Sequence, residues 1–303
     1  MREFFDIIIV GGGPAGLTAA VYARRAGKSV LVLEKEGFGG QIASAPKVEN
    51  FPGFAAISGA ELADRLFSQA EALGARLELE EVTEITSGAV KTVTTDYGAY
   101  DCAALILATG MRHRTLGLAG EDTLSGISYC AVCDGAFYAG KDVAVCGGGS
   151  TALQDALFLS EVCRHVTVIH RRAAFRGDPI LVDALRKREN VSFALEAEVV
   201  ALTGRDGALE ALTLRHLDGR LETLTVSGLF EAVGQMPQEV LSRQLGLADE
   251  GGFLRAGEDC RTAANGVFAA GDCRAKSVRQ LTTACADGAV AALAACDWCA
   301  HMS

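Results

Sequence analysis

The feature that most constrains the fold is a segment that occurs twice. Residues 6–16 form an apolar run ending in the pattern G-x-G-x-x-G, and residues 142–152 repeat it 136 positions later with alanine in the last place. In both copies apolar residues then recur at helical spacing, and a second apolar run follows at 29–34 and 165–170. One such loop could be a glycine-rich turn of an ordinary α/β sheet. Found twice in register, the arrangement predicts two β-α-β dinucleotide-binding units.

The two units differ where a nucleotide ribose is expected. Glycine is needed in each loop because the backbone must turn tightly and approach a pyrophosphate at the start of a helix. The second strand of the first unit ends in Glu34, whose carboxylate can accept hydrogen bonds from ribose hydroxyls. In the second unit this place holds His170, Arg171 and Arg172, followed by Arg176, and guanidinium groups suit a 2′-phosphate. We therefore expect FAD in the first unit and NADPH in the second, although such arginines can also be the solvated start of a helix.

Two thiols lie between the repeats, in the sequence Cys130-Ala131-Val132-Cys133-Asp134. A disulfide ring this short constrains the unfolded chain little, so its value is expected to be catalytic rather than structural. Asp134 could give or take the proton that thiol–disulfide exchange moves, because the thiolate is the attacking species. Half of a zinc site is the alternative, but no second pair of ligands lies nearby in the sequence.

Composition limits the class of protein. The 303 residues are enough for two domains, and the 35 glycines suit an α/β protein with many tight turns. A net charge of −10 argues against nucleic acid or an anionic membrane as partner. The first ten residues have too short an apolar run for a signal peptide, and no later run reaches the length of a membrane span. Most of the 10 cysteines are therefore expected to be reduced thiols of a cytoplasmic protein.

The remaining periodicity completes two α/β domains. It predicts helices at about 59–74 and 279–296, a small antiparallel sheet at 76–101, and further strands at about 104–110, 191–198, 208–217, 221–227, 228–234 and 260–272.

We expect the second unit to be inserted into the first. The expected boundaries are an FAD-binding domain at 1–112 and 244–303, and an NADPH-binding domain with the thiol pair at 113–243. Two crossings of one boundary predict a hinge.

The order of these motifs resembles the low-molecular-weight thioredoxin reductases, and the resemblance extends over essentially the whole chain. It is specific because the thiol pair lies inside the NADPH unit, whereas in the glutathione-reductase branch the pair follows the FAD loop. The resemblance implies two Rossmann-like domains of three layers (ββα), a homodimer, and thioredoxin or a thioredoxin-like protein as partner. It also implies electron transfer from NADPH through FAD to a Cys130–Cys133 disulfide, with rotation of the inserted domain between steps.

The resemblance also assigns roles to individual residues. Cys133 would face the flavin, Cys130 would attack the thioredoxin disulfide, and Asp134 would be the proton donor and acceptor. The residues that it places around FAD are Gly11, Gly13, Pro14, Ala15, Gly16, Glu34, Gly40, Gln41, Asn50, Ala108, Thr109, Gly110, Gly271, Asp272, Arg279, Gln280 and Leu281. Those that it places around NADPH are Gly147, Gly149, Ser150, Thr151, His170, Arg171, Arg172 and Arg176.

A second C-x-x-C, Cys296-Asp297-Trp298-Cys299, does not belong to this pattern. We expect these to be thiols on a frayed helix end, with an accessory redox pair or a zinc site shared with the first C-x-x-C as alternatives. Residues without a partner pattern are expected to be structural; they are Cys102, Cys146, Cys163, Cys260, Cys273, Cys285, His113, His165 and His216.

Two other functions are compatible with parts of the sequence. A flavoenzyme could take electrons from ferredoxin or oxidise small dithiols with oxygen, but it would have little need of the arginines and the intact second loop. A non-catalytic redox sensor would leave both nucleotide units unexplained. The sequence therefore favours the NADPH-dependent reductase.

Overall fold

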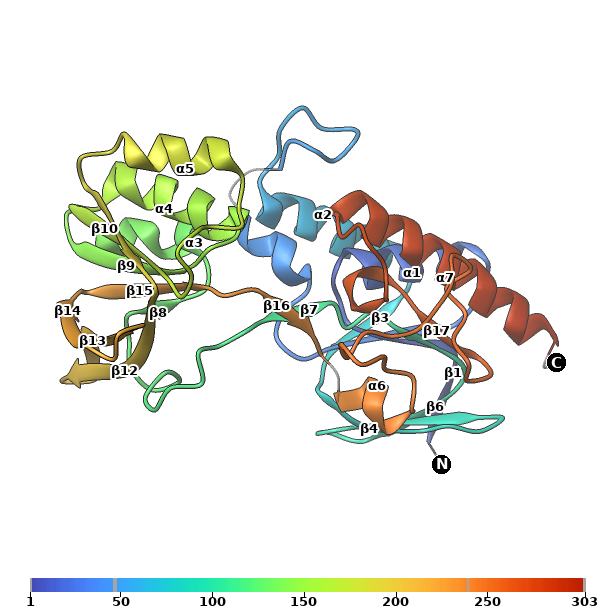
Figure 1. Cartoon of the computed structure of the whole chain (residues 1–303). Helices are drawn as coiled ribbons and strands as arrows, with labels where there is room; N and C mark the ends of the chain where they lie inside the picture. Colours follow the sequence, from blue (N-terminus) through green and yellow to red (C-terminus); the bar gives the residue numbers. More distant parts are fainter. Residues whose placement is uncertain (1, 46–47, 239, 302–303) are drawn as a thin grey trace. The chain divides into compact units, whose positions relative to one another are not determined.

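The computed structural model describes residues 2–45, 48–238 and 240–301, and for Cys133 the backbone only. The chain forms two compact units: unit 1 comprises Met1–Arg112 and Met236–Ser303, and unit 2 comprises His113–Gln235 (Figure 1). The second boundary between the units therefore follows Gln235, whereas the sequence predicts it after residue 243. The reason is helix α6 (Val240–Gln244), whose Leu241 packs into the core of unit 1.

Unit 1 is built on one sheet with strand order β3-β2-β1-β6-β5-β4, and β17 pairs with the carboxyl end of β6, beyond the residues of β6 that pair with β5. The first repeat forms its centre, where Ile7 of β1 pairs with Val30 of β2 and Ala104 of β6, all in parallel. The strands are β1 (Glu3–Val10), β2 (Val30–Glu34), β3 (Arg76–Leu79), β4 (Val82–Thr86), β5 (Lys91–Thr95), β6 (Ala99–Leu107) and β17 (Val267–Ala269).

Residues alternate between the two faces of this sheet, as strand geometry requires. Ile7 and Ile9 point to the face covered by helices α1 (Pro14–Arg25), α2 (Gly59–Ala72) and α7 (Leu281–His301). Ile8 and Val10 point to the opposite core, which includes residues of β4, β5 and α6.

The segment 76–101 differs from the expected antiparallel sheet in one strand. β4, β5 and β6 do form an antiparallel meander, but β3 pairs in parallel with β2 and extends the main sheet. The segment expected to be a strand at 260–272 is regular only over β17, and then enters the short 3₁₀ helix η3 (Gly271–Cys273).

Unit 2 repeats the architecture around the second loop. Its sheet has the order β11-β10-β9-β15-β8 and all pairings are parallel. Apolar residues on one face pack against the helices, and those on the other face pack against a three-stranded antiparallel sheet, which gives the expected three layers. The elements are β8 (Ile127–Ser128), α3 (Ala131–Asp134), η2 (Gly135–Tyr138), β9 (Asp142–Gly147), α4 (Ser150–Val162), β10 (His165–His170), α5 (Pro179–Arg186), β11 (Val191–Leu195), β12 (Ala197–Arg205), β13 (Ala208–His216), β14 (Leu221–Thr225) and β15 (Gly228–Ala232).

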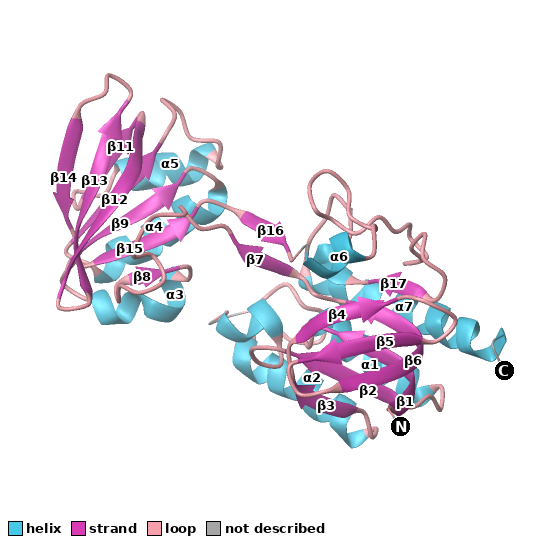
Figure 2. Cartoon of the chain, turned by 90° about the horizontal axis from the view of Figure 1, so that it is seen from below, coloured by secondary structure: helices cyan, strands magenta, loops and turns pink. Residues whose placement is uncertain are grey.

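The strand expected at 191–198 is in fact two strands. Glu196 has a φ of 52°, a left-handed conformation that ends β11 and turns the chain into β12 on a different sheet. The two segments that link the units pair with each other as β7 (Met111–His113) and β16 (Gln235–Pro237) (Figure 2). Each crossing of the boundary is therefore held by the other crossing.

Candidate functional site: two glycine loops and a thiol loop

The first glycine loop connects β1 to α1 and lies against other backbone of unit 1. Gly11 has a φ of 110°, and a Cβ there would overlap the carbonyl oxygen of Ala108. A Cβ at Gly40 would lie 3.2 Å from the Cα of Gly13, and one at Gly271 would lie 2.8 Å from the Cβ of Ala15. The expected FAD residues from four distant segments therefore do meet at the start of α1.

Glu34 holds this loop from the end of β2. Its Oε2 accepts the N–H of Gly12 at 2.7 Å, and its Oε1 accepts the N–H groups of Lys35 and Glu36 at 2.8 and 3.0 Å. The carboxylate is thus fixed beside the loop by backbone donors. Part of it stays exposed, as a ribose ligand must be.

The outer expected residues are held by contacts with one another and with other residues of unit 1. Gln41 Nε2 donates to the carbonyl of Met111 at 2.8 Å, and Asn50 Nδ2 donates to Gln280 Oε1 at 3.3 Å. Thr109 hydrogen-bonds the Cys273 thiol, whose pKa burial raises. Pro14 is the first residue of α1 and Leu281 the first of α7, while Gly110 has a φ of 60°.

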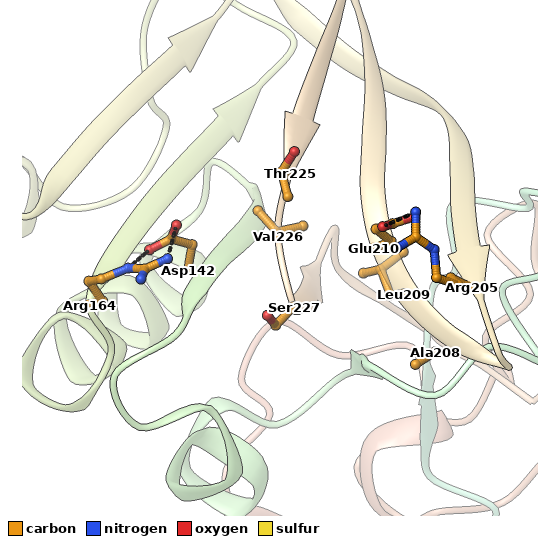
Figure 3. A pocket seen from close by; sticks show the side chains of 9 residues that line it. All are labelled: Asp142, Arg164, Arg205, Ala208, Leu209, Glu210, Thr225, Val226 and Ser227. Atoms are coloured by element: carbon orange, nitrogen blue, oxygen red, sulfur yellow. Dashed lines mark hydrogen bonds and ion pairs between the residues drawn. The ribbon is translucent and has the colours of Figure 1, made fainter.

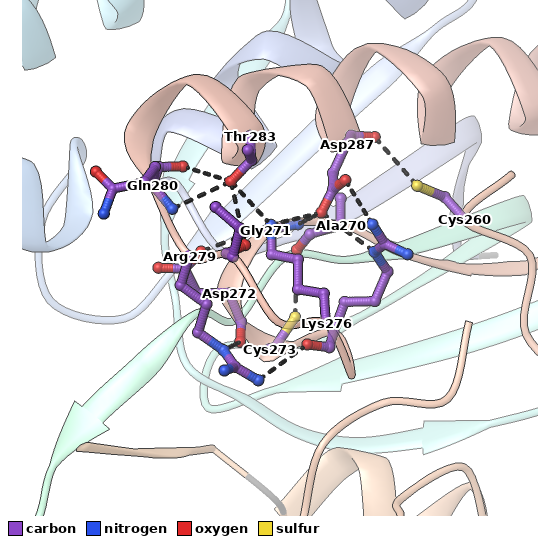
Figure 4. A network of polar contacts seen from close by, with 12 residues as sticks. Cys260, Ala270, Gly271, Asp272, Cys273, Lys276, Arg279, Gln280, Thr283 and Asp287 are labelled. Carbon is purple, nitrogen blue, oxygen red and sulfur yellow. Dashed lines mark hydrogen bonds and ion pairs between the residues drawn. The ribbon is translucent and has the colours of Figure 1, made fainter. Parts of the chain in front are cut away.

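A buried ion-pair network that the sequence did not single out supports η3 (Figure 4). Asp287 of α7 accepts hydrogen bonds from Arg274 Nε and NH2 at 3.2 and 2.9 Å and from Lys276 Nζ at 2.9 Å. Its Oδ2 also accepts the N–H of Gly271 at 3.1 Å. The three charged side chains are at most 12% exposed. The network therefore holds the loop Gly271–Asp272 through a buried contact with its backbone.

Asp272 itself has a buried oxygen without a partner among the described residues. Its Oδ1 makes no hydrogen bond and lies 3.7 Å from Lys276 Nζ, and burial raises the pKa of this carboxyl. Arg279 does not reach it, because its Nε donates to the Asp272 carbonyl at 3.1 Å and its guanidinium lies 4.1 Å from the ring of Phe253. An orphaned buried acceptor of this kind indicates a missing donor.

The second glycine loop repeats these restraints in unit 2. A Cβ at Gly147 would overlap the carbonyl oxygen of Ala232, and one at Gly148 would overlap the imidazole of His170. A Cβ at Gly149 would meet no described atom within 4 Å, although Gly149 has an ordinary φ of −93°. The protein's own packing therefore requires glycine at 147 and 148, but not at 149.

His170 is packed against the loop rather than exposed beside it. The side chain is buried, it stacks on Phe175 with ring centroids 5.4 Å apart, and its Nε2 has no partner among the described residues. Burial lowers the pKa of the imidazole, and the nearby arginines lower it further. A neutral ring at this place can accept a hydrogen bond.

The arginines stand at the end of β10 beside a cleft of about 780 Å³. Arg171 and Arg176 line the cleft together with the glycine loop and Thr151, whereas Arg172 and Ser150 do not. All three arginines are exposed, and none forms an ion pair with another described residue. Ser150 instead accepts the N–H of Asp178 at 3.1 Å. The cleft thus combines a helix start with unpaired positive charge, as an anionic ligand requires.

A smaller cavity of about 300 Å³ lies at the opposite end of β9 (Figure 3). Its charges are already paired: Arg164 binds Asp142 through two hydrogen bonds of 2.7 and 2.6 Å, and Arg205 lies 2.8 Å from Glu210. Ligands of parallel sheets bind at the carboxyl ends of the strands, so this cavity is not a candidate site.

The thiol loop belongs to unit 2, with Cys130 between β8 and α3 and with Cys133 and Asp134 in α3 itself. Cys130 is disulfide-bonded, and the side chain of its expected partner Cys133 lies outside what the structure describes. The hydroxyl of Ser128 donates to Asp134 Oδ2 at 2.7 Å and accepts the N–H of Cys130 at 3.1 Å. Ser128 is buried and was missed from the sequence, because only the fold brings its hydroxyl between the two residues.

The expectation of a frayed end at the tail thiols is wrong. α7 extends through Cys296 and Cys299 to His301. Cys299 is buried, and its thiol donates to the carbonyl of Asp6 at 3.4 Å, which anchors the helix end to β1. No cluster of three or more potential metal ligands occurs among the described residues.

Comparison with known proteins assigns the family. The sequence profile of the pyridine nucleotide-disulphide oxidoreductases matches residues 5–288. The thioredoxin reductase of Listeria monocytogenes is 41% identical over 295 residues, which cover 96% of this chain and 92% of that protein. The chain belongs to the thioredoxin reductase family of pyridine nucleotide-disulphide oxidoreductases. The resemblance found in the sequence is thereby confirmed.

Solved thioredoxin reductases also share the fold. The enzyme of Lactococcus lactis in its FR conformation matches with a TM-score of 0.88 and 35% identity, covering 98% of this chain and 99% of that one. The enzyme of T. acidophilum matches with a TM-score of 0.84 and 34% identity over the same shares. The expected fold class is confirmed. None of the described helices is long and apolar enough to cross a membrane.

Proposed function

We propose that this chain is an NADPH-dependent thioredoxin reductase, which passes electrons through FAD and the Cys130–Cys133 disulfide to the disulfide of thioredoxin or a thioredoxin-like protein. The observation that carries the proposal is the disulfide-bonded Cys130 in the same unit as the arginine-flanked glycine loop. Family membership and the thioredoxin reductases found by comparison support it.

The residues of unit 1 fit FAD. The crowded glycines leave the backbone of the loop open to a pyrophosphate at the start of α1, and the orphaned Oδ1 of Asp272 offers an acceptor for a hydroxyl donor. Glu34 would hold the adenosine ribose, while Gly40, Gln41, Asn50, Thr109 and Gln280 would lie along the rest of the cofactor. When bound, FAD supplies the step that converts a hydride into an electron pair for a disulfide.

The residues of unit 2 fit NADPH. Gly147 and Gly149 would let the pyrophosphate approach, His170 would present a neutral acceptor, and Arg171, Arg172 and Arg176 would bind the 2′-phosphate. Arg172 is not part of the cleft lining. To bind the phosphate, its side chain would have to extend over the edge of the cleft.

The thiol loop would carry out the exchange with the protein substrate. The reduced Cys130 thiolate attacks the substrate disulfide, a mixed disulfide forms, and Cys133 displaces the reduced product. Asp134, oriented by the hydroxyl of Ser128, would take the thiol proton and return it to the leaving thiolate.

The partners and location belong to the same proposal. A homodimer is expected, with no nucleic acid or membrane partner. Reduced cysteines among the described residues, such as Cys102, Cys146 and Cys163, support a reducing compartment, and we place the enzyme in the cytoplasm.

Replacing Gly149 by alanine tests whether a ligand approaches the second loop. The new Cβ meets no protein atom within 4 Å, so the free energy of unfolding should change by no more than about 0.5 kcal/mol. The NADPH concentration for half-maximal flavin reduction should rise by about tenfold or more, which corresponds to about 1.4 kcal/mol. Gly98→Ala, also in open space but in unit 1, is the matched control and should change neither quantity. An unchanged NADPH requirement in Gly149→Ala would contradict the assignment of the loop.

Replacing Arg171 and Arg172 together by glutamine tests the 2′-phosphate assignment. Hydrogen bonds to charged groups contribute about 1.5–3 kcal/mol each, so the NADPH requirement should rise by about two orders of magnitude. The NADH requirement should change little, because NADH lacks the phosphate. Equal shifts for both nucleotides would refute the assignment, and Arg188→Gln, whose guanidinium pairs with Glu161 away from the loop, provides the control.

Turnover tests the function itself. NADPH oxidation that depends on added oxidised thioredoxin is expected. Turnover supported by reduced ferredoxin but not by NADPH, or oxygen-dependent oxidation of small dithiols, would favour the alternative enzymes instead.

A further inference from the structure

Two carboxyl groups of unit 2 meet beside the cleft of the second glycine loop; Glu231 is part of the cleft lining, but neither group has a role in the chemistry proposed above. Glu121 follows the segment that enters unit 2, and Glu231 lies on β15. The N–H of Leu116 lies 2.8 Å from Glu121 Oε1 and 3.2 Å from Glu231 Oε2, and the N–H of Leu118 donates to Glu121 Oε2 at 2.7 Å. Because oxygens of both carboxyl groups approach the same N–H, the two groups lie close together, and a hydrogen bond between them requires a proton on one of them.

Glu231 is the carboxyl that keeps the proton. It is 2% exposed, and its Oε1 has no partner among the described residues if it is ionised. Burial, followed by the contact with Glu121, raises its pKa to about 8. Burial opposes ionisation of Glu121 as well, but the hydrogen bonds from Glu231 and from backbone amides outweigh it and lower the pKa of Glu121. At pH 7 the pair therefore holds one proton and one negative charge.

The pair lies where both linkers enter unit 2. Leu116 is two residues after Arg114, whose N–H donates to the carbonyl of Gly234 at 2.9 Å, next to the paired strands β7 and β16. Glu121 also accepts the hydroxyl of Tyr129 at 3.5 Å, and Tyr129 precedes Cys130 in the chain. The root of each linker and the start of the thiol loop are thus connected through two carboxyl groups.

We propose that Glu231, in its protonated form, is a positioning residue that ties the segment 113–121 to β15 and so fixes the roots of both linkers in unit 2. When the proton is lost, two carboxylates face each other and compete for the N–H of Leu116, so this connection loosens. The inference rests on the proposed function. In a reductase of this kind, unit 2 has to rotate about these linkers between flavin reduction by NADPH and reduction of the disulfide by the flavin.

Other ionisable groups surround the pair. They are His113, whose ring stacks on Tyr129 with centroids 5.5 Å apart, Arg114 and Tyr129 on the entering chain, Cys146 on β9, Asp155 on α4, and Glu198 and Arg215 on the three-stranded sheet. Burial raises the pKa of Tyr129 to about 12 and that of Asp155 to about 6, so neither titrates near pH 8. Burial lowers the pKa of His113, which is therefore neutral there as well.

Infrared spectroscopy of the purified enzyme tests the protonation directly. The wild type is expected to show the C=O band of a neutral carboxylic acid at pH 7, which disappears with a midpoint near pH 8. The band should be missing in Glu231→Gln. It should be unchanged in Asp155→Asn, which is the control because Asp155 is the other carboxyl of the cleft with a raised pKa. In Glu121→Gln the midpoint should move to lower pH, because the neighbouring negative charge that raises the pKa of Glu231 is removed. This second variant tests the assignment even if Glu231→Gln folds poorly. A band at pH 8 that survives Glu231→Gln would overturn the proposal.

The ratio of thioredoxin turnover at pH 9 to that at pH 7 tests the positioning role. In the wild type Glu231 keeps its proton in about one molecule in ten at pH 9, so the ratio should be lower than in Glu231→Gln by up to about tenfold. Glutamine stays neutral at both pH values and still hydrogen-bonds Glu121. Equal ratios in the two proteins would overturn the role. Absence of turnover in both would refute the proposed function, whereas the infrared band decides the protonation of Glu231 independently.

Discussion

Replacing Cys130 by serine is expected to abolish turnover with a protein disulfide while leaving flavin reduction by NADPH intact. The thiol of Cys130 is the nucleophile of the proposed exchange, and a serine hydroxyl is not ionised near neutral pH and forms no disulfide. Loss of an activated nucleophile lowers turnover by about four orders of magnitude or more. The rates of flavin bleaching and of thioredoxin reduction, measured on the same preparation, separate the two halves of the reaction.

Cys296→Ser is the matched control for this change. Cys296 is a half-buried free thiol on α7, so its replacement changes one sulfur outside the proposed electron path. Turnover in Cys296→Ser should equal that of the wild type. If Cys130→Ser also kept its turnover, Cys130 would have no part in the mechanism. If Cys296→Ser lost it, the tail thiols would have to be included.

Replacing Asp287 by asparagine is expected to lower the free energy of unfolding by about 3–5 kcal/mol and to release FAD. The substitution keeps the shape of the side chain but leaves Arg274 buried without a negative partner and Lys276 with only Asp272, 3.7 Å away. It also weakens the acceptor for the N–H of Gly271, which fixes the loop that carries Asp272. Urea unfolding followed by circular dichroism, and the ratio of flavin to protein absorbance after gel filtration, measure the two effects.

Asp297→Asn on the same helix is the control for Asp287. Asp297 pairs with Arg261 at 3.1 Å, but both side chains are more than a third exposed. Exposed pairs of this kind contribute about 0–1 kcal/mol, so stability and flavin content should stay close to those of the wild type. Similar losses in both variants would mean that the Asp287 network has no special role in holding the cofactor loop.

The architecture could be predicted because its determinants are local and repeated. Strand, glycine loop, helix and second strand follow one another within about thirty residues in each unit. The first glycine of each loop is required by a backbone contact, that of Gly11 with Ala108 and that of Gly147 with Ala232. Glu34 and Arg171 could be located for the same reason, since Glu34 is the last residue of the second strand in its unit and Arg171 directly follows the second strand in the other.

The supporting residues could not be predicted because their partners are distant in sequence and ordinary in type. Asp287 lies in the middle of a helix, and nothing in the sequence connects it with the N–H of Gly271. The pairing of Glu121 with Glu231 joins residues 110 positions apart, and like charges are not expected to be neighbours. The end of α7 was placed too early because the contact of Cys299 with Asp6 becomes visible only in the folded chain.

The most direct test of NADPH as the electron donor is to mix the purified protein anaerobically with NADPH, and separately with NADH, while the flavin absorbance is followed. Rapid bleaching of the flavin by NADPH is expected, at a much lower concentration than NADH requires, followed by recovery of the absorbance when oxidised thioredoxin is added. A flavin that is present but bleached by neither nucleotide would rule out an NADPH-dependent reductase, because the second glycine loop would then not be a working NADPH site.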